Sequence, residues 1–285
     1  MTIQPECIGC IIAQSGRVCD AIHADESLRK RIISYVETTL QNANFTLSPP
    51  IIAAPLYEQI AILAQIDDLY EEQKQHASVQ AKSYIPFLEE TIQNSDDPLI
   101  AILKTAVVGN VIDLAAEVSF DLHEAIMSVF NMPFAHDDTK TLHATLTHTK
   151  TLLYIGDNAG EHIFDALAIR FLQKLYPHIA VTYLVRGNPI INDVTMSEAQ
   201  EAGIDKVCTL MDSGVPTPGF VYSLASPEAK KLFDSADLII AKGMGNYECM
   251  TPQQRQNICF LLKVKCSVVA ASLNLKIGDI VCKLS

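Results

Sequence analysis

Residues 151–177 read TLLYIGDNAGEHIFDALAIRFLQKLYP, and this stretch decides the fold class. It opens with a short apolar run that is typical of a buried strand. After the turn GDNAGE, the residues Phe164, Leu167 and Phe171 recur at spacings of three and four. That spacing places their side chains on one face of a helix. The stretch therefore predicts a strand, a turn and a helix in succession.

Similar apolar runs recur through the second half of the chain. They are VTYLVRG at 181–187, KVCTLMD at 206–212, DLIIAKG at 237–243 and CSVVAAS at 266–272, and each ends in Gly, Asp or Ser. TMSEAQEAG at 195–203 and SPEAKKLFDSA at 226–236 lie between them and have helical patterns. Strands that alternate with helices predict an α/β fold with a doubly wound, mostly parallel sheet, covered on both faces as an α-β-α sandwich.

The first half of the chain has a different character. Leu28, Ile32, Val36 and Leu40 lie four apart and predict one apolar helix face. Residues 96–116 and 122–130 also have helical patterns, and strand-like alternation is scarce. We therefore predict two parts, a helical N-terminal region at 1–145 and an α/β domain at 146–285.

Composition, charge and hydropathy disfavour several classes of protein. The formal net charge of −12 disfavours nucleic acid and anionic membranes, since both need a basic surface. The sequence has no apolar run long enough to span a membrane and no basic segment followed by an apolar one at its start. Eight cysteines, several of them in apolar runs, are typical of reduced core residues. We expect a cytoplasmic protein.

Polar residues follow each predicted strand. In such a sheet, ligands bind in the crevice beyond the carboxyl ends of the strands, so these residues are the candidates for a site. They are Asp157, Asn158 and Glu161 after the first strand, Arg186, Asn188, Asn192 and Asp193 after the second, Asp212 after the third, and Lys242, Asn246 and Glu248 after the fourth.

The turn GDNAGE has two interpretations. It is not the GxGxxG turn of a dinucleotide-binding fold. Either Asp157 or Asn158 is the N-cap of the next helix, or the two bind a hard cation such as Mg²⁺ or Mn²⁺ through oxygen. A cap needs only one such side chain, and here two are adjacent with Glu161 three residues further on.

Two further loops carry charge. Asp193 is a candidate third metal ligand or the cap of the next helix, and Arg186 is a candidate phosphate ligand or a surface ion-pair partner. Lys242 would be costly to bury unpaired, so we expect it to point into a wet, anionic site. Gly243 and Gly245 would allow the backbone to approach a ligand closely.

The segment CIGC at 7–10 is a CxxC motif. Cys7 and Cys10 are candidates for a structural metal site, a redox pair or part of a core. A closed zinc site needs four ligands, and only Cys19 or His23 lies near enough in sequence to contribute another. We expect this segment to be separate from the catalytic site.

Taken together, the motifs resemble those of the DUF89 family of metal-dependent damage-control phosphatases (ARMT1-like), in the prokaryotic branch with an N-terminal CxxC. They are GNVID at 109–113, GDNAGE at 156–161, VRGNPIINDVT at 185–195 and DLIIAKGMGNYE at 237–248. The resemblance implies a divalent metal on Asp157, Asn158 and Asp193, with Asn110 and the loop from Lys242 to Glu248 near the substrate phosphate. It departs at DDLYEEQK, residues 67–74, where Leu69 replaces the proline of DPYxxxK.

The sequence thus predicts a phosphatase that hydrolyses small phosphate monoesters, such as sugar phosphates or damaged phosphometabolites. The cofactor would be Mg²⁺ or Mn²⁺, with Co²⁺ or Ni²⁺ as alternatives. Asp157, Asp193 and Glu161 are the predicted catalytic carboxylates, and the candidate phosphate ligands are Arg186, Asn188, Asn192, Lys242, Gly243, Gly245, Asn246 and Asn110. Two alternatives are an adenosylmethionine-dependent methyltransferase and a non-catalytic metal- or metabolite-binding protein. Neither the oligomeric state nor the choice between water attack and a phospho-aspartyl intermediate follows from the sequence.

Overall fold

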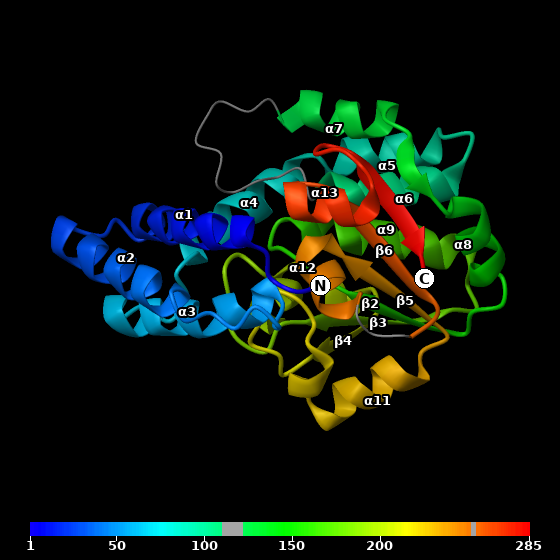
Figure 1. The fold of residues 1–285 in the computed structure, drawn as a ribbon. Coiled ribbons are helices and arrows are strands. Elements are labelled where there is room, and N and C mark those ends of the chain that lie inside the picture. Colours follow the sequence, from blue (N-terminus) through cyan, green and yellow to red (C-terminus); the bar gives the residue numbers. More distant parts are fainter. Residues whose placement is uncertain (110–121, 252–254) are drawn as a thin grey trace.

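The computed structural model describes residues 1–109, 122–251 and 255–285. Seven strands form one sheet (Figure 1), and they are β1 (Phe134–Asp137), β2 (Thr151–Ile155), β3 (Ala180–Val185), β4 (Thr209–Asp212), β5 (Leu238–Lys242), β6 (Ile258–Lys263) and β7 (Ile280–Leu284). Their order is β1-β7-β6-β5-β2-β3-β4, and every neighbouring pair is parallel except β6 and β7. The predicted α/β fold with a mostly parallel sheet is confirmed.

Helices cover both faces of the sheet because alternate strand residues point to opposite sides. Leu152 and Tyr154 of β2 pack in one core cluster, whereas Leu153 and Ile155 pack in another. The first cluster includes residues of α4 (Glu71–Ser83), α5 (Ile85–Gln93), α6 (Pro98–Val108), α7 (Leu122–Asn131), α8 (Thr139–Leu146), α9 (Glu161–Leu175) and α10 (Met196–Glu201). The second includes residues of α11 (Pro227–Ser235), α12 (Gly243–Met250) and α13 (Ser267–Leu273).

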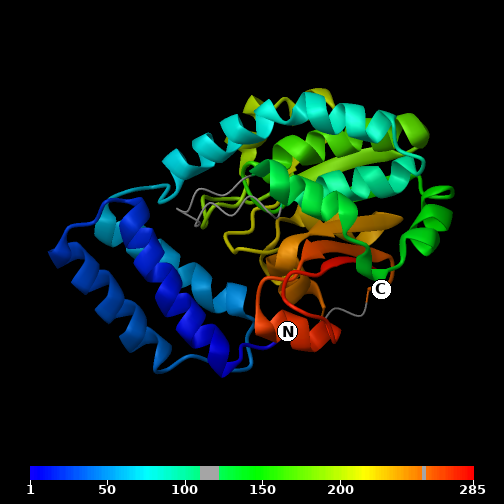
Figure 2. The same ribbon diagram turned by 90° about the horizontal axis from the view of Figure 1, so that it is seen from above.

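Three N-terminal helices form a separate unit beside the sheet (Figure 2). They are α1 (Pro5–Ala21), α2 (Glu26–Leu40) and α3 (Pro49–Ala64), and they pack around their own core cluster. Ile32, Val36 and Leu40 lie in that cluster, as the four-residue spacing predicts. Helices α4 to α7 instead share a core with the sheet, and β1 joins the sheet upstream of the boundary predicted at residue 146.

The prediction of a strand at CSVVAAS is wrong. Residues Ser267–Leu273 form α13, with Cys266 as the N-cap that accepts from the amide of Val269. The adjacent strand is β6, whose sequence ICFLLK is the more apolar run, and β1 and β7 were also not predicted. Alanine and serine in CSVVAAS offset the β-branched valines, and the cap starts a helix.

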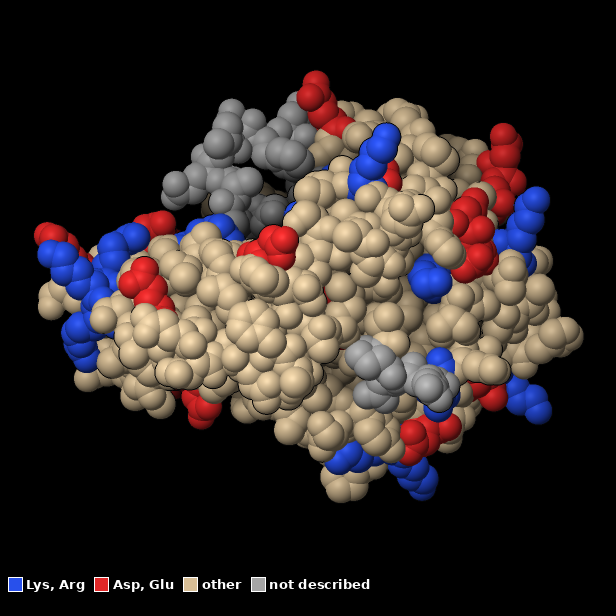
Figure 3. Space-filling view, in the orientation of Figure 1, with Lys and Arg blue, Asp and Glu red and all other residues tan. Residues whose placement is uncertain are grey.

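Among the described residues, no helix is long and apolar enough to cross a membrane. On the face shown in Figure 3, Lys and Arg side chains occur singly or in small groups, with acidic residues among them. This face has no continuous basic stripe of the kind that nucleic acid requires.

Candidate active site

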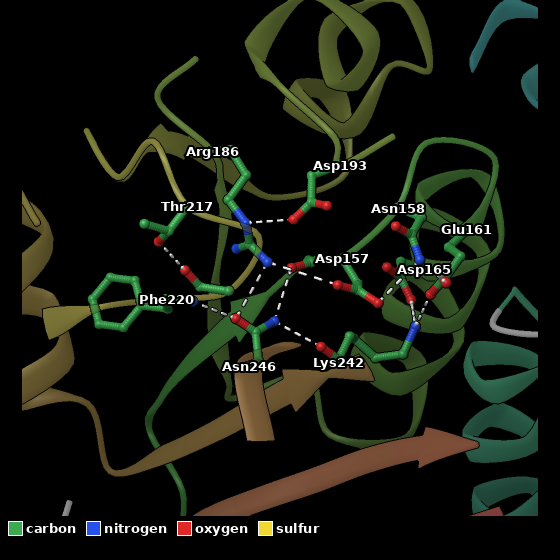
Figure 4. Close-up of polar contacts among 12 residues, drawn as sticks. Asp157, Asn158, Glu161, Asp165, Arg186, Asp193, Thr217, Phe220, Lys242 and Asn246 are labelled. Atoms are coloured by element: carbon green, nitrogen blue, oxygen red, sulfur yellow. Dashed lines mark hydrogen bonds and ion pairs between the residues drawn. The ribbon is translucent and has the colours of Figure 1, made fainter. Parts of the chain in front are cut away.

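The candidate site lies at the carboxyl end of β2, which has β5 on one side and β3 on the other. From β2 the chain proceeds outward to β3 and β4, and the strands β5 and β6 lie on the other side. This reversal of direction opens a crevice beyond the strand ends, where α/β proteins bind their ligands. The residues that follow β2, β3 and β5 therefore meet there (Figure 4).

In the turn after β2, the side chain of Asn158 contacts the carboxylates of Asp157 and Glu161 rather than the amides of the helix. The Asn158 amide nitrogen donates to Asp157 Oδ2 at 3.1 Å and to Glu161 Oε1 at 2.8 Å. The N-cap of α9 is Gly160, at φ +87°, and no side chain caps this helix. The interpretation of Asp157 or Asn158 as an N-cap is therefore wrong, and their polar groups serve the site.

The loop after β3 brings Asp193 against this turn. Asn158 and Asp193 form an isolated antiparallel bridge, and the Val194 amide donates to the Asp157 carbonyl at 2.8 Å. Helix α10 is capped by Thr195 and Glu198 in a capping box. Asp193 is therefore not a helix cap, and the two backbone segments hold it beside Asp157.

Arg186 contacts the carboxylates of both Asp157 and Asp193. Its side chain is 1% exposed, so the interpretation as a surface ion pair is wrong. Its Nε donates to Asp193 Oδ2 at 2.7 Å, and one terminal nitrogen lies 3.7 Å from Asp157 Oδ1 and 3.3 Å from Asn246 Oδ1. The other terminal nitrogen, Nη1, is buried and has no partner among the described residues.

Two carboxylates of α9 hold the ammonium group of Lys242. Its Nζ donates to Asp165 Oδ1 at 2.8 Å and lies 3.3 Å from Glu161 Oε2. Its exposed fraction is zero, so the expected anionic surroundings are present, but the side chain is buried and does not point into open solvent. Direct contact of Lys242 with a phosphate stays a prediction.

Asp165 is the site residue that sequence reasoning missed. It accepts from Tyr154 Oη at 2.6 Å and from Tyr183 Oη at 2.9 Å, in addition to Lys242. Its position four residues after Glu161 on α9 places both carboxylates on one helix face. That spacing is the signal that would have identified it.

Gly243 is required by the close approach of the backbone to Asp157. Its φ is +75°, and a Cβ at this position would lie 1.8 Å from Asp157 Oδ2. The predicted close approach at this glycine is thus directed at a site carboxylate. Gly245 lines the cavity described below, and a Cβ there would lie 2.2 Å from the Pro218 carbonyl.

The buried acids outnumber the buried bases. Four carboxylates (Asp157, Glu161, Asp165 and Asp193) face two cations (Arg186 and Lys242), which gives a difference of two negative charges when all are ionised. Burial and the neighbouring carboxylates of Glu161 and Asp193 raise the pKa of Asp157 well above its usual range. Burial also raises the pKa of Asp193 to about 6, against the lowering effect of Arg186.

A cavity of about 760 Å³ opens over this cluster. Asp157, Asn158, Asn192 and Asp193 line it together with residues of α1 and α3, so both the sheet domain and the helical unit contribute to its wall. Cys7 and Cys10 also line this cavity, so the CxxC motif is not remote from the candidate site, and whether the two act separately stays a prediction. The helical unit thus closes the crevice that the sheet provides.

Some predicted residues lie elsewhere. Asn188 is exposed and lines a second groove beside α3, and Asp212 is exposed and accepts from the Gly214 amide at 2.6 Å. Asn246 is fully buried and holds backbone groups beneath the site. Asn110 lies outside the described residues.

The metal prediction depends on a mixed ligand set. Within residues 1–109, 122–251 and 255–285, no three His, Cys, Asp or Glu side chains are arranged to hold a metal ion. Asp157 and Asp193 supply two carboxylates, and Asn158 would have to add its amide oxygen. Within the same ranges, no third such side chain joins Cys7 and Cys10, so a zinc site with Cys19 or His23 gains no support.

Comparison with known proteins identifies the family. The model of the damage-control phosphatase ARMT1-like domain matches residues 3–281. The damage-control phosphatase PH1575 of Pyrococcus horikoshii is 30% identical over 99% of this chain and 98% of its own length. A damage-control phosphatase of Archaeoglobus fulgidus is 30% identical over 100% of this chain and 99% of its own.

A solved structure agrees over the whole fold. The crystal structure of the DUF89 family protein PH1575 superimposes with a TM-score of 0.91 and 30% identity, and it covers 100% of this chain and 99% of its own. The motifs GDNAGE, VRGNPIINDVT and DLIIAKGMGNYE therefore occur in a fold that matches a DUF89 family protein. The chain belongs to the damage-control phosphatase ARMT1-like family, also called DUF89.

Proposed function

We propose that this protein is a divalent-metal-dependent phosphatase that hydrolyses small phosphate monoesters. The observation that carries the proposal is the cluster of four buried carboxylates against two buried cations at the end of β2. Burying uncompensated negative charge is costly, so this arrangement supports a bound cation. The printed names of the relatives supply the reaction class.

The donor set suits a hard divalent ion. Asp157, Asn158 and Asp193 would hold it through oxygen, with water or substrate oxygens as the other ligands, a pattern that Mg²⁺ and Mn²⁺ favour and that Co²⁺ or Ni²⁺ can also adopt. Such an ion would lower the pKa of water and neutralise phosphate oxygens. The raised pKa values of Asp157 and Asp193 fit side chains whose charge is compensated only when a cation is present.

The chain's own residues have separable tasks. The unpartnered Nη1 of Arg186 is a buried donor suited to a phosphate oxygen. Asp165 and Glu161 fix Lys242, which places a positive charge behind Asp157. Asp193 lines the cavity and Glu161 does not, so Asp193 is the better placed of the two to accept the proton of an attacking water.

The substrate would be a small phosphorylated metabolite. A cavity of about 760 Å³ accommodates a sugar phosphate or a cofactor fragment and is within the size range of small-molecule sites. A methyltransferase gains no support, because the turn after β2 offers Asp157 and Asn158 in place of a glycine-rich loop. The cytoplasmic location stays a prediction.

The test combines turnover with metal binding. Purified protein should hydrolyse an aryl phosphate only when Mn²⁺ or Mg²⁺ is added after chelator treatment. Asp157→Ala should lower this activity by roughly 10²–10³-fold, as expected for the loss of one preorganised charged group. Titration calorimetry should show weakened Mn²⁺ binding.

Asp212→Ala is the matched control. It also removes an aspartate at the end of a strand, but this side chain is exposed and outside the cavity. Its activity and Mn²⁺ binding should equal those of the parent. Full activity of Asp157→Ala in chelator-treated buffer would overturn both the metal assignment and the phosphatase mechanism that depends on it.

A further inference from the structure

The CxxC motif has no role in the proposed phosphatase chemistry, yet it lies in the wall of the same cavity. Cys7 and Cys10 are in the first half of α1, and Cys266 is the N-cap of α13. All three line the cavity that contains Asp157 and Asp193. All eight cysteines of the chain are free thiols. The cavity wall therefore carries three of them.

The two cysteines of the motif have the spacing of a disulfide pair. Residues three apart in an α-helix have Cα atoms about 5 Å apart, which is within the range that disulfides span. Cys7 is 9% exposed, whereas Cys10 is exposed. Cys10 is thus reachable by a reagent in solution, and Cys7 is the buried partner beside it.

We propose that Cys7 and Cys10 are a redox-active dithiol whose oxidation to a disulfide reshapes the catalytic cavity. The oxidant would be a peroxide. The Cys10 thiolate attacks one peroxide oxygen, the O–O bond breaks, and a sulfenic acid and water (or an alcohol) form. The Cys7 thiol then attacks that sulfur, the S–S bond forms, and the hydroxyl leaves as water. The two thiols supply two electrons and two protons.

Exposure and burial assign the order of these steps. Burial raises the pKa of Cys7, so less of it is thiolate and it is the slower nucleophile. Cys10 therefore reacts first, and Cys7 resolves the sulfenic acid. Cys266 also lines the cavity, but its Sγ caps α13 by accepting from the Val269 amide at 3.4 Å. It is the alternative resolving thiol that a test must distinguish.

Closing the bond must move the cavity wall. Cβ atoms at helix positions i and i+3 are about 5–6 Å apart, and a disulfide needs about 3.5–4.5 Å. The first turn of α1 therefore has to tighten by roughly 1 Å or more. Glu6, Ile11 and Gln14 of the same helix also line the cavity, so the shift would change the surface that a substrate meets. This effect on substrate rests on the proposed function.

The disulfide can be mapped without any assay of turnover. Folded protein would be treated with hydrogen peroxide, alkylated, digested and analysed by mass spectrometry for a Cys7–Cys10 bridge. Cys259 and Cys282 are buried with their Sγ atoms 3.8 Å apart and are a competing pair, so a Cys259→Ser background is used. We expect a loss of two hydrogen masses in the peptide that holds Cys7 and Cys10, reversed by dithiothreitol. No such bridge, or a bridge to Cys266, overturns the proposal.

Activity on an aryl phosphate with added Mn²⁺ measures the coupling to the cavity. We expect oxidation to lower kcat/KM by roughly tenfold, below the ~10²-fold that a 1 Å displacement at a site can cost. Cys10→Ser should resist peroxide, with the same kcat/KM before and after treatment, while Cys19→Ser, on the same helix but outside the cavity lining, should stay sensitive. A mapped bridge with unchanged kcat/KM overturns the coupling. A mapped bridge in a protein whose reduced form has no phosphatase activity rejects only the proposed function.

Discussion

Asn246 shows how one side chain can hold several parts of the site. Its Nδ2 donates to the carbonyls of Gly156 at 3.1 Å and Lys242 at 2.6 Å, which joins the ends of β2 and β5. Its Oδ1 accepts from the Phe220 amide at 2.8 Å and from Arg186 at 3.3 Å. The amide therefore fixes the backbone beneath Asp157 and the guanidinium that pairs with both aspartates.

Asn246→Ala should destabilise the protein strongly. The change leaves buried donors and acceptors unpaired, at about 1–3 kcal/mol for each group that stays unsatisfied. We expect the free energy of unfolding to fall by about 3 kcal/mol or more in urea denaturation. Asn188→Ala is the matched control, because this asparagine is exposed in the loop after β3 and should change stability by less than about 0.5 kcal/mol. Equal effects of the two variants would contradict this account of Asn246.

At the scale of elements, Lys74 connects the segment after α3 to the loop that carries Asp193. It lies on α4, is 1% exposed, and its Nζ contacts both Asp68 and Glu198. Glu198 in turn completes the capping box of α10 with Thr195, two residues after Asp193. The segment DDLYEEQK thus supplies an aspartate and a lysine to a buried ion-pair network, and its Leu69 is buried in the core of the helical unit.

Lys74→Met should lower the free energy of unfolding, because it removes the cation that pairs with both Asp68 and Glu198. Removing one member of a buried ion pair leaves uncompensated charge and typically costs about 3–5 kcal/mol. The side chains of Asp68 and Glu198 are 16% and 18% exposed, so water partly compensates their charge. We therefore expect the free energy of unfolding to fall by about 2–3 kcal/mol, at or below the lower end of that range. Urea denaturation of Lys74→Met, Glu198→Gln and the double variant measures the coupling. Additive effects of the two single changes would refute a direct interaction.

The sequence predicts best those helices and strands whose apolar residues recur at a regular spacing. Helix α9 and strand β2 follow directly from residues 151–177, because the apolar spacing changes at the turn between them. Strand β1 is only four residues long. Of its residues FAHD only the first, Phe134, is buried, so the strand offers little apolar signal. The strand prediction at 266–272 fails because the two valines favour a strand, whereas the cap at Cys266 starts a helix.

The sequence could predict those site residues whose position follows from the parallel direction of the strands. Asp157, Asn158 and Asp193 follow neighbouring parallel strands, so their meeting follows from the fold class. The place of Cys7 and Cys10 was not predictable, because it depends on how the helical unit packs against the strand ends. Asn188 and Asn192 are in one loop but face different cavities, which only the backbone path decides.

For the whole molecule, buried titratable groups influence stability in opposite directions as pH changes. Burial raises the pKa of Asp193 to about 6 and that of Glu248 to about 7. Because their folded pKa values are raised, their protonation below these values favours the folded state. His162 has the opposite tendency, since burial lowers its pKa from 6.5 to about 4. A measured curve of stability against pH is the sum of these terms.

His162 can be isolated by substitution. Its ring is 1% exposed, and Nδ1 accepts from the Gly160 amide at 3.0 Å, so protonation there would break the bond that holds the turn. Charged groups near the ring are Glu198, which favours the charged form, and Lys74 and Lys82, which oppose it. As pH falls from about 6.5 to about 4, the unfolded chain takes up a proton that the folded protein does not.

The free energy of unfolding should therefore decrease over that pH range through His162. A difference of 6.5 minus about 4 corresponds to about 3 kcal/mol, at about 1.4 kcal/mol for each pKa unit. His162→Gln removes this titration, whatever its effect on stability at neutral pH. The measurement is urea denaturation of parent and variant at several pH values between 4 and 8. We expect the difference between the two curves to be flat above pH 6.5 and to change by about 3 kcal/mol below it, with the parent losing more stability. Parallel curves through the whole range would show that His162 is not held neutral in the folded protein.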